Sequence, residues 1–386
     1  MKSNYKKLGQ FIQTVSIKNT DLKVTNLLCV SITKKFIPSI ANTIGTDMSK
    51  YKLVKKNQFT YGSITSRNGD KISVALLEYD EAIVSTSYTV FEVIDKEELL
   101  PEYLMMWFRR TEFDRYARYM SHGSTREAFG WDEMCDVELP VPSIEKQKEI
   151  VKEYHTITDR IKLNEQLNQK LEETAQAIYK EWFVDFEFPN EDGKPYKSSD
   201  GAMVYCGELD IEIPVGWDYL CIEQISDLKY GKMLDSNKFL DSGYPIFSGY
   251  GIRGYYSSFM YEEPQILVLC RGVSGTGEVR ISPPKAYITN LSIVVEIKHS
   301  KMSKYFVYYY LKNQNLRKLD SGSAQSQITI NDLNRFPVLN PSENIQKKFD
   351  KFIQNLELNL DAKNKSNKYL NNLKAILLSK MATIKD

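Results

Sequence analysis

An internal repeat is the feature that most constrains how this chain can fold. Residues 123–150 match residues 322–349 at a constant offset of 199 positions. The pairs that are identical in the two copies include Gly123 and Gly322, Ser124 and Ser323, Pro142 and Pro341, Ser143 and Ser342, and Gln147 and Gln346. The offset continues without a gap into two long segments, 143–185 and 342–384. Because two such units fill a chain of 386 residues, we expect two copies of one structural unit.

The two long segments are predicted to be helices that pair with each other. Each begins with Pro, then Ser as the N-cap, then an acidic residue in the first turn, and each has apolar residues at heptad spacing. At 1.5 Å per residue each helix would be roughly 65 Å long, which is too long for an ordinary core helix. The first segment has seven basic and nine acidic residues, and the second has eight and four. These opposite net charges favour antiparallel pairing within one chain.

The segments before each helix predict domains of mixed structure. Short β-rich runs at 72–79, 265–270 and 291–297 alternate with short helices, which is typical of an α+β fold. We therefore expect two α+β domains, related by a pseudo-twofold axis and separated by two long antiparallel helices. The predicted boundaries are 1–142 for the first domain, 143–188 for the central helix, 189–212 for a polar linker, 213–341 for the second domain and 342–386 for the C-terminal helix.

Composition excludes several classes of protein. No apolar run approaches the roughly 18 residues of a membrane span, and the N-terminus lacks a secretory pattern, so a cytoplasmic protein is expected. Five dispersed cysteines and three histidines form no metal-binding pattern, so no metal is expected. The net charge of +1 gives no overall sign of a nucleic-acid partner, but residues 1–56 hold eleven lysines against two acidic residues. A solvated lysine-rich face explains that segment equally well.

Catalytic motifs are missing from the sequence. We find no GxxxxGK[ST], GxSxG or HExxH, and no Asp/Asn-Pro-Pro-aromatic tetrapeptide of the kind with which amino-methyltransferases hold a flipped base. We therefore expect a non-catalytic protein.

Polar, Gly-rich loops with basic and aromatic residues recur at repeat-equivalent places. They lie at 61–67 and 121–126 in the first domain, and at 249–256, 271–274 and 321–327 in the second. Glycine lets a backbone approach DNA, Ser and Thr bond phosphate oxygens, and Arg and Gln can pair with purine edges. Such loops are usually plain turns, but their recurrence favours binding. The candidate DNA contacts are Tyr61, Ser63, Arg67, Ser124, Thr125, Arg126, Tyr250, Arg253, Arg271, Ser274, Ser323, Gln325 and Gln327.

Three sets of motifs resemble a known family. They are Ala175-x-x-Ile178-Tyr179-x-x-Trp182-Phe183-Val184-Asp185-Phe186; Gly207-Glu208-Leu209 before Ile213-Pro214-x-Gly216-Trp217; and the endings Leu139-Pro140-x-Pro142 and Phe336-Pro337-x-Leu339-x-Pro341, followed by Gln147 or Gln346. With these motifs the chain resembles, over nearly its whole length, the specificity subunit of type I restriction-modification systems.

The resemblance implies a function and a set of partners. In that family two target-recognition domains each read one half of a split, asymmetric sequence in double-stranded DNA, and the helices define the gap. Two modification (methyltransferase) subunits would dock on the helices, and restriction (translocase and nuclease) subunits would complete the complex. S-adenosylmethionine, ATP and Mg²⁺ are then expected on those partners, with no cofactor in this chain.

The resemblance also suggests which helix residues face the partners. The candidates are the apolar heptad positions Ile157, Ile161, Leu171, Ile178, Trp182, Leu356, Leu360, Leu370 and Leu377. The second helix has Lys374 and Met381 where the first has Ala175 and Trp182, so the two docking faces need not be equivalent. One alternative is a fused restriction-methylase whose recognition part resembles this chain, which the missing catalytic motifs disfavour. The other is a coiled-coil adaptor or scaffold without DNA specificity. The target bases and the spacer length cannot be predicted, because one fold can present different loop side chains.

Overall fold

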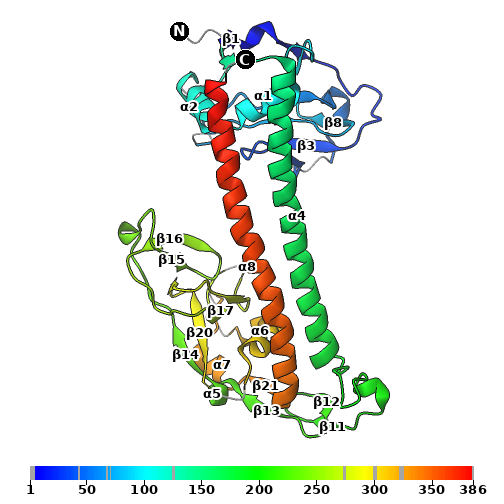
Figure 1. Cartoon of the computed structure of the whole chain (residues 1–386), viewed down its shortest axis with the longest axis vertical. Coiled ribbons are helices and arrows are strands. Elements are labelled where there is room, and N and C mark those ends of the chain that lie inside the picture. The colour runs from blue at the N-terminus through cyan, green and yellow to red at the C-terminus, as the bar shows by residue number, and fades with distance from the viewer. Residues whose placement is uncertain are drawn as a thin grey trace. The chain divides into compact units, whose positions relative to one another are not determined.

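The computed structural model describes residues 5–41, 44–66, 68–69, 71–123, 127–272, 275–298, 302–320 and 326–384 (Figure 1). These residues form two compact units. Unit 1 comprises the N-terminal part of the chain up to Glu165 together with the C-terminal part from Asn364, and unit 2 comprises Gln166–Lys363. Since the boundary falls inside both long helices, each unit contains one end of each helix.

Unit 1 contains three sheets and three short helices. A four-stranded antiparallel sheet has the order β2-β9-β6-β7, a mixed sheet has the order β4-β3-β8-β5, and β1 pairs with β10. The strands are β1 (Tyr5–Lys7), β2 (Ile12–Val15), β3 (Leu27–Val30), β4 (Phe36–Pro38), β5 (Lys52–Lys55), β6 (Gln58–Tyr61), β7 (Val74–Leu76), β8 (Glu81–Val84), β9 (Thr89–Val93) and β10 (Glu138–Pro140). The helices are α1 (Pro101–Phe108), α2 (Thr111–Tyr119) and α3 (Trp131–Cys135).

Unit 2 repeats much of this plan. The sheets have the orders β14-β20-β17-β18, β16-β15-β19, β13-β21 and β11-β12. The strands are β11 (Met203–Cys206), β12 (Ile211–Pro214), β13 (Asp218–Cys221), β14 (Ser226–Tyr230), β15 (Tyr244–Phe247), β16 (Ile252–Tyr256), β17 (Ile266–Leu269), β18 (Val279–Ile281), β19 (Tyr287–Ile288), β20 (Ser292–Ile297) and β21 (Pro337–Asn340). The short helices are α5 (Ile222–Ile225), α6 (Lys304–Lys312) and α7 (Ile330–Asn334).

The topology confirms the internal repeat and the α+β class. Sheet β14-β20-β17-β18 has the strand order and chain directions of sheet β2-β9-β6-β7, and β13-β21 corresponds to β1-β10. Helix α6 follows β20 as α1 follows β9, and each short helix before the long one, α3 and α7, lies just ahead of β10 and β21. The two halves therefore share one sheet-and-helix plan, as the sequence offset predicts.

The long helices are α4 (Ile144–Phe183) and α8 (Glu343–Lys380), and they pair in an antiparallel direction within each unit (Figure 1). In unit 1, Ile150 near the start of α4 shares a core with Met381, just beyond the end of α8. In unit 2, Trp182 near the end of α4 packs 5.8 Å, between ring centroids, from Phe352 near the start of α8. None of the nine apolar heptad residues named above is exposed, as the predicted pairing of the two helices requires.

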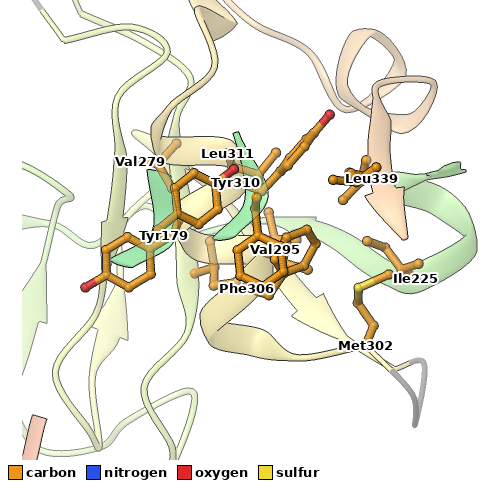
Figure 2. Packing of buried hydrophobic residues seen from close by; sticks show 14 of the residues in the cluster. Tyr179, Ile225, Val279, Val295, Met302, Phe306, Tyr310, Leu311 and Leu339 are labelled. Carbon is orange, nitrogen blue, oxygen red and sulfur yellow. The ribbon is translucent and has the colours of Figure 1, made fainter. Parts of the chain in front are cut away.

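Each unit builds its core from its sheet, its short helices and the two helix ends. In unit 2, Tyr179 of α4 lies among apolar residues of α6 and the central sheet, 6.0 Å from the ring centroid of Tyr309 (Figure 2). Phe183 packs against Phe306 at 4.7 Å between ring centroids. The aromatic residues at the end of the central helix are therefore core residues of the second domain.

The segment 189–212, predicted as a linker, contains regular structure. It holds β11, the start of β12 and a short 3-10 turn at Lys197–Ser199. Tyr196 stacks on Phe188 with ring centroids 4.6 Å apart, and Phe188 stacks on Trp217 at 4.9 Å.

Among the described residues, no helix combines the length and the apolar character needed to cross a bilayer. The domain boundaries derived from the sequence stay a prediction.

Candidate nucleic-acid interface

In the first domain, the two predicted loops lie side by side. The backbone N–H of Thr65 donates to the carbonyl of Glu127 at 2.9 Å, and the Thr65 hydroxyl donates to the Ser121 hydroxyl at 3.0 Å. The Phe129 N–H donates to the carbonyl of Ser63 at 2.8 Å. Loops that are about sixty residues apart in sequence therefore form one surface next to the end of β6.

In the second domain, three predicted loops meet in the corresponding place. Arg271 forms an isolated antiparallel bridge with Gln327, and the Ile328 N–H donates to the carbonyl of Cys270 at 3.0 Å. The Tyr250 hydroxyl donates to the carbonyl of Arg271 at 3.1 Å, which brings in the loop around residue 250.

The two loop assemblies are related by the repeat. Ala128 forms an antiparallel bridge with Ile64 in the first domain, as Gln327 does with Arg271 in the second. Ala128 and Gln327 are separated by the repeat offset of 199 positions. The recurrence of this assembly, which the sequence only suggested, is thus visible in the backbone pairing of both domains.

The second assembly exposes two arginine side chains. The guanidinium of Arg271 lies over the ring of Tyr230, 5.9 Å from its centroid, and the hydroxyl of Tyr230 accepts the Ile330 N–H at 3.2 Å. Arg253 is exposed, and its Nε donates to the Ser248 hydroxyl at 3.4 Å. Sequence reasoning missed Tyr230, whose only signal is its position between two lysines in Lys229-Tyr230-Gly231-Lys232.

Gly272 and Gly275 make room for Tyr250. A Cβ added at Gly275 would lie 2.5 Å from the Tyr250 ring, and one at Gly272 would lie 2.3 Å from the Tyr250 hydroxyl oxygen. Gly272 also has φ of +125°, a conformation that other residues rarely adopt. These glycines let the ring lie against the loop, which positions Tyr250 beside Arg271.

Tyr61 lies in the core of the first domain and not on the surface of its loops. It is 1% exposed, its ring packs edge-on against Phe91, and burial raises the pKa of its hydroxyl to about 12. Strand β6 is covered on both faces, so its last residue belongs to the core. Ser63 is half-buried, and its carbonyl already pairs with Phe129. Seven further predicted contacts lie outside the described residues: Arg67, Ser124, Thr125, Arg126, Ser274, Ser323 and Gln325.

The lysines of residues 1–56 do not all face solvent. Lys34 is buried, with its Nζ 2.5 Å from a carboxylate oxygen of Asp114 and 3.1 Å from the carbonyl of Ile72. Burial lowers the pKa of Lys34, although Asp114 opposes this shift. The same Asp114 oxygen accepts the Ile72 N–H at 3.1 Å, so the ion pair anchors the segment that follows the loop at 61–67. Further lysines are paired with acids at the surface: Lys7 with Asp136, Lys23 with Asp21, and Lys50 with Asp47.

The candidate docking residues on the long helices lie in the seam between these helices. Ile161 and Trp182 are buried, and the half-buried members are Ile157, Leu171, Ile178, Leu356, Leu360, Leu370 and Leu377. Apolar side chains that face solvent occupy other positions. On the unit 1 part of α8, Tyr369, Leu373 and Ile376 are each more than half exposed, at a spacing that puts them on one face. The sequence-based prediction missed this face because it considered only the heptad positions, where the apolar pattern is stronger.

Metal ligands are not assembled in the described part of the chain. No group of three or more His, Cys, Asp or Glu side chains there has the arrangement to hold a metal ion.

Comparison with known proteins gives consistent matches. The profile of a family described as "Type I restriction modification DNA specificity domain" matches residues 2–173 and 214–372. The chain is 27% identical over 318 residues to the type I restriction enzyme MjaIX specificity subunit of Methanocaldococcus jannaschii, covering 77% of this chain and 69% of that protein. It is 32% identical over 160 residues to the HindI specificity subunit of Haemophilus influenzae, covering 41% of this chain and 34% of that protein.

A solved structure is similar over almost its whole length. The crystal structure of the S subunit of a type I restriction-modification system from M. genitalium superposes with a TM-score of 0.58 at 16% identity, covering 99% of this chain and 96% of that chain. At this identity the likeness concerns the fold alone.

Proposed function

The chain belongs to the type I restriction modification DNA specificity family as a specificity subunit with two recognition domains, and we propose that its paired loops are the surfaces that read DNA. Each domain would read one half of a split, asymmetric target in double-stranded DNA. The observation that carries this proposal is the recurrence of one loop assembly at repeat-equivalent positions in both domains. In the second domain, the exposed guanidinium groups of Arg253 and Arg271 can form paired hydrogen bonds with guanine in the major groove.

Two modification subunits are the proposed partners of the paired helices. The heptad residues are used within the chain, so a partner has to contact the outer faces. The stripe of Tyr369, Leu373 and Ile376 supports this assignment, because a monomeric surface rarely aligns three large apolar side chains on one helix face. Restriction subunits would join through the modification subunits. S-adenosylmethionine, ATP and Mg²⁺ would be bound by these partners, while this chain binds and orients the DNA.

Methylome sequencing tests the proposal directly. The chain is co-expressed with its modification subunit, and we expect adenine methylation in a two-part motif with a fixed gap. Arg271→Ala should relax one base position in one half only, at a cost of about 1–3 kcal/mol in discrimination. Arg280→Ala is the matched control, since Arg280 is an exposed arginine of β18 in the same domain, and its guanidinium pairs with Glu278. A methylation pattern that does not depend on this chain would contradict the proposal.

A domain exchange separates recognition from a scaffold role. Replacing residues 1–142 with those of a relative should change one half of the methylated motif and preserve the other. A coiled-coil adaptor would leave the whole motif unchanged.

A further inference from the structure

A buried glutamine links the start of α4 to the recognition part of unit 1. The side-chain oxygen of Gln147 accepts the N–H of Leu100, the N-cap residue of α1, at 2.9 Å. Its side-chain nitrogen donates to the carbonyls of Glu98 at 2.8 Å and Pro142 at 2.9 Å. Gln147 is 0% exposed. One side chain therefore joins the first turn of the long helix, the turn before it and the entry to α1.

The repeat-equivalent glutamine makes the same connection in unit 2. The side-chain oxygen of Gln346 accepts the N–H of Ser303, the N-cap residue of α6, at 2.8 Å, and its nitrogen donates to the carbonyl of Pro341 at 2.8 Å. Gln346 is 2% exposed. Glutamine suits this place because its amide supplies both an acceptor and two donors without a charge.

The two glutamines make equivalent hydrogen bonds, but the side chains around them differ between the two units. In unit 2 the Ser303 hydroxyl donates to the carboxylate of Asp350, whereas the equivalent neighbours in unit 1 are the apolar Leu100 and Val151. Apolar contacts are not directional, so they hold two elements together without defining their angle. Hydrogen bonds are directional, and those of the glutamine join the same elements in both units. The glutamine hydrogen bonds, which both units share, are therefore suited to define the angle between each domain and its long helix.

We propose that Gln147 and Gln346 are positioning residues that hold each recognition domain at one orientation on the start of its long helix. The inference rests on the proposed function, because the orientation matters only if the domains read two half-sites at a defined gap. A domain that can tilt would still read its own bases, but it would accept gaps of more than one length. The glutamines would thus contribute to spacer fidelity without contacting DNA.

The test measures gap length and base identity separately. Full-length chains with Gln147→Met or Gln346→Met are combined with the modification subunit and given DNA libraries with the native gap and with gaps one base pair shorter or longer. We expect discrimination against the altered gaps to fall on the order of tenfold, as the loss of about one buried hydrogen bond would produce, with both half-site sequences unchanged. Gln147→Glu, protonated in this buried site, keeps one acceptor and one donor and should give an intermediate loss.

Controls separate positioning from folding. Gln169→Met and Gln354→Met change exposed glutamines on the same two helices and should leave gap discrimination as in the wild type. Hydrogen exchange of the Leu100 and Ser303 amides should become faster only in the corresponding methionine variant. Unchanged gap discrimination in folded methionine variants would overturn the inference, as would loss of the folded state in both of them. If the wild-type chain itself directs no two-part methylation, the proposed function has failed instead.

Discussion

At the scale of single residues, the buried ion pair of Lys34 and Asp114 anchors the first recognition domain. It bonds both the N–H and the carbonyl of Ile72, at the point where the chain returns from the recognition loop. Removing one partner leaves an uncompensated buried charge, so Lys34→Met should lower the free energy of unfolding by about 3–5 kcal/mol. Urea unfolding of the purified chain measures this loss.

A surface ion pair of the same domain is the matched control. Lys23→Met removes a pair with Asp21 that is open to solvent, and the expected loss of stability is much smaller than for Lys34→Met, because water and salt screen an exposed pair. Equal losses in the two variants would mean that Lys34 does not stabilise the domain through its buried charge.

Single residues also show where sequence reasoning fails. Tyr61 stands at the start of a polar, Gly-rich segment that is typical of a turn. In the structure it is the last residue of a strand that is covered on both faces, and it is buried. Lys34 belongs to a lysine-rich segment but lies inside the domain. In both cases the decisive neighbours, Phe91 and Asp114, are distant in sequence, so no local pattern could reveal them. Arg271 was predicted from its residue type and from the recurrence of its loop in the repeat, whereas its place in the loop assembly depends on its pairing with Gln327.

At the scale of elements, the two long helices could be predicted because their signals are local. The N-cap residues, the heptad spacing and the repeat all lie within the segments themselves. The observed helices begin one residue after the predicted starts, but they end at Phe183 and Lys380, before the predicted ends at 188 and 386. The loop assemblies could not be predicted, because the contact of Thr65 with Ser121 depends on how the intervening sheet folds. Sequence therefore predicted the elements better than their contacts.

The middle of the seam contains a polar contact that we expect to define the register of the helices. The buried Asn164 side chain donates to the side-chain oxygen of Asn367 at 2.7 Å. Asn164→Leu alone should lower the free energy of unfolding by about 1–3 kcal/mol, because the Asn367 oxygen loses its donor in a buried place. The double variant with Asn367→Leu should recover this loss while defining the register less strictly. Denaturant unfolding in a double-mutant cycle measures both effects, with the exposed Asn355→Leu as control.

A half-buried carboxyl group on α8, that of Glu357, should make unit 2 sensitive to pH. Burial raises the pKa of Glu357, and the nearby carboxylates of Glu172 and Asp361 raise it further, against the opposing effect of Lys304 and Lys312. The folded state then binds a proton more tightly than the unfolded state, so this group's contribution to stability is present at low pH. It decreases as the pH rises above the ordinary value of 4.5.

Replacing this group by an amide tests the sign of the effect. Glu357→Gln should raise the melting temperature by about 1–3 °C at pH 7, and the difference from the wild type should vanish near pH 4. Glu153→Gln, which removes an exposed carboxylate from α4, is the matched control. A difference that grows toward low pH would contradict the assigned cause.

At the scale of the whole molecule, the balance of charges limits how tightly the chain alone can hold DNA. Its net charge is +1, and four of the eleven lysines in residues 1–56 pair with acidic side chains. Phosphate contacts release counterions, and each contributes about −0.9 to the slope of log K against log salt concentration. We expect a slope shallower than about −3 for the chain alone. Once the modification subunits join, the slope should become steeper, because they add several phosphate contacts.

Fluorescence anisotropy with the methylated motif between about 50 and 200 mM salt measures both slopes. A scrambled duplex of equal length should lower the affinity without changing the slope, because base contacts carry the specificity and phosphate contacts the salt dependence. Equal slopes with and without the partners would mean that this chain already supplies most of the phosphate contacts, from cationic groups that its overall charge does not reveal.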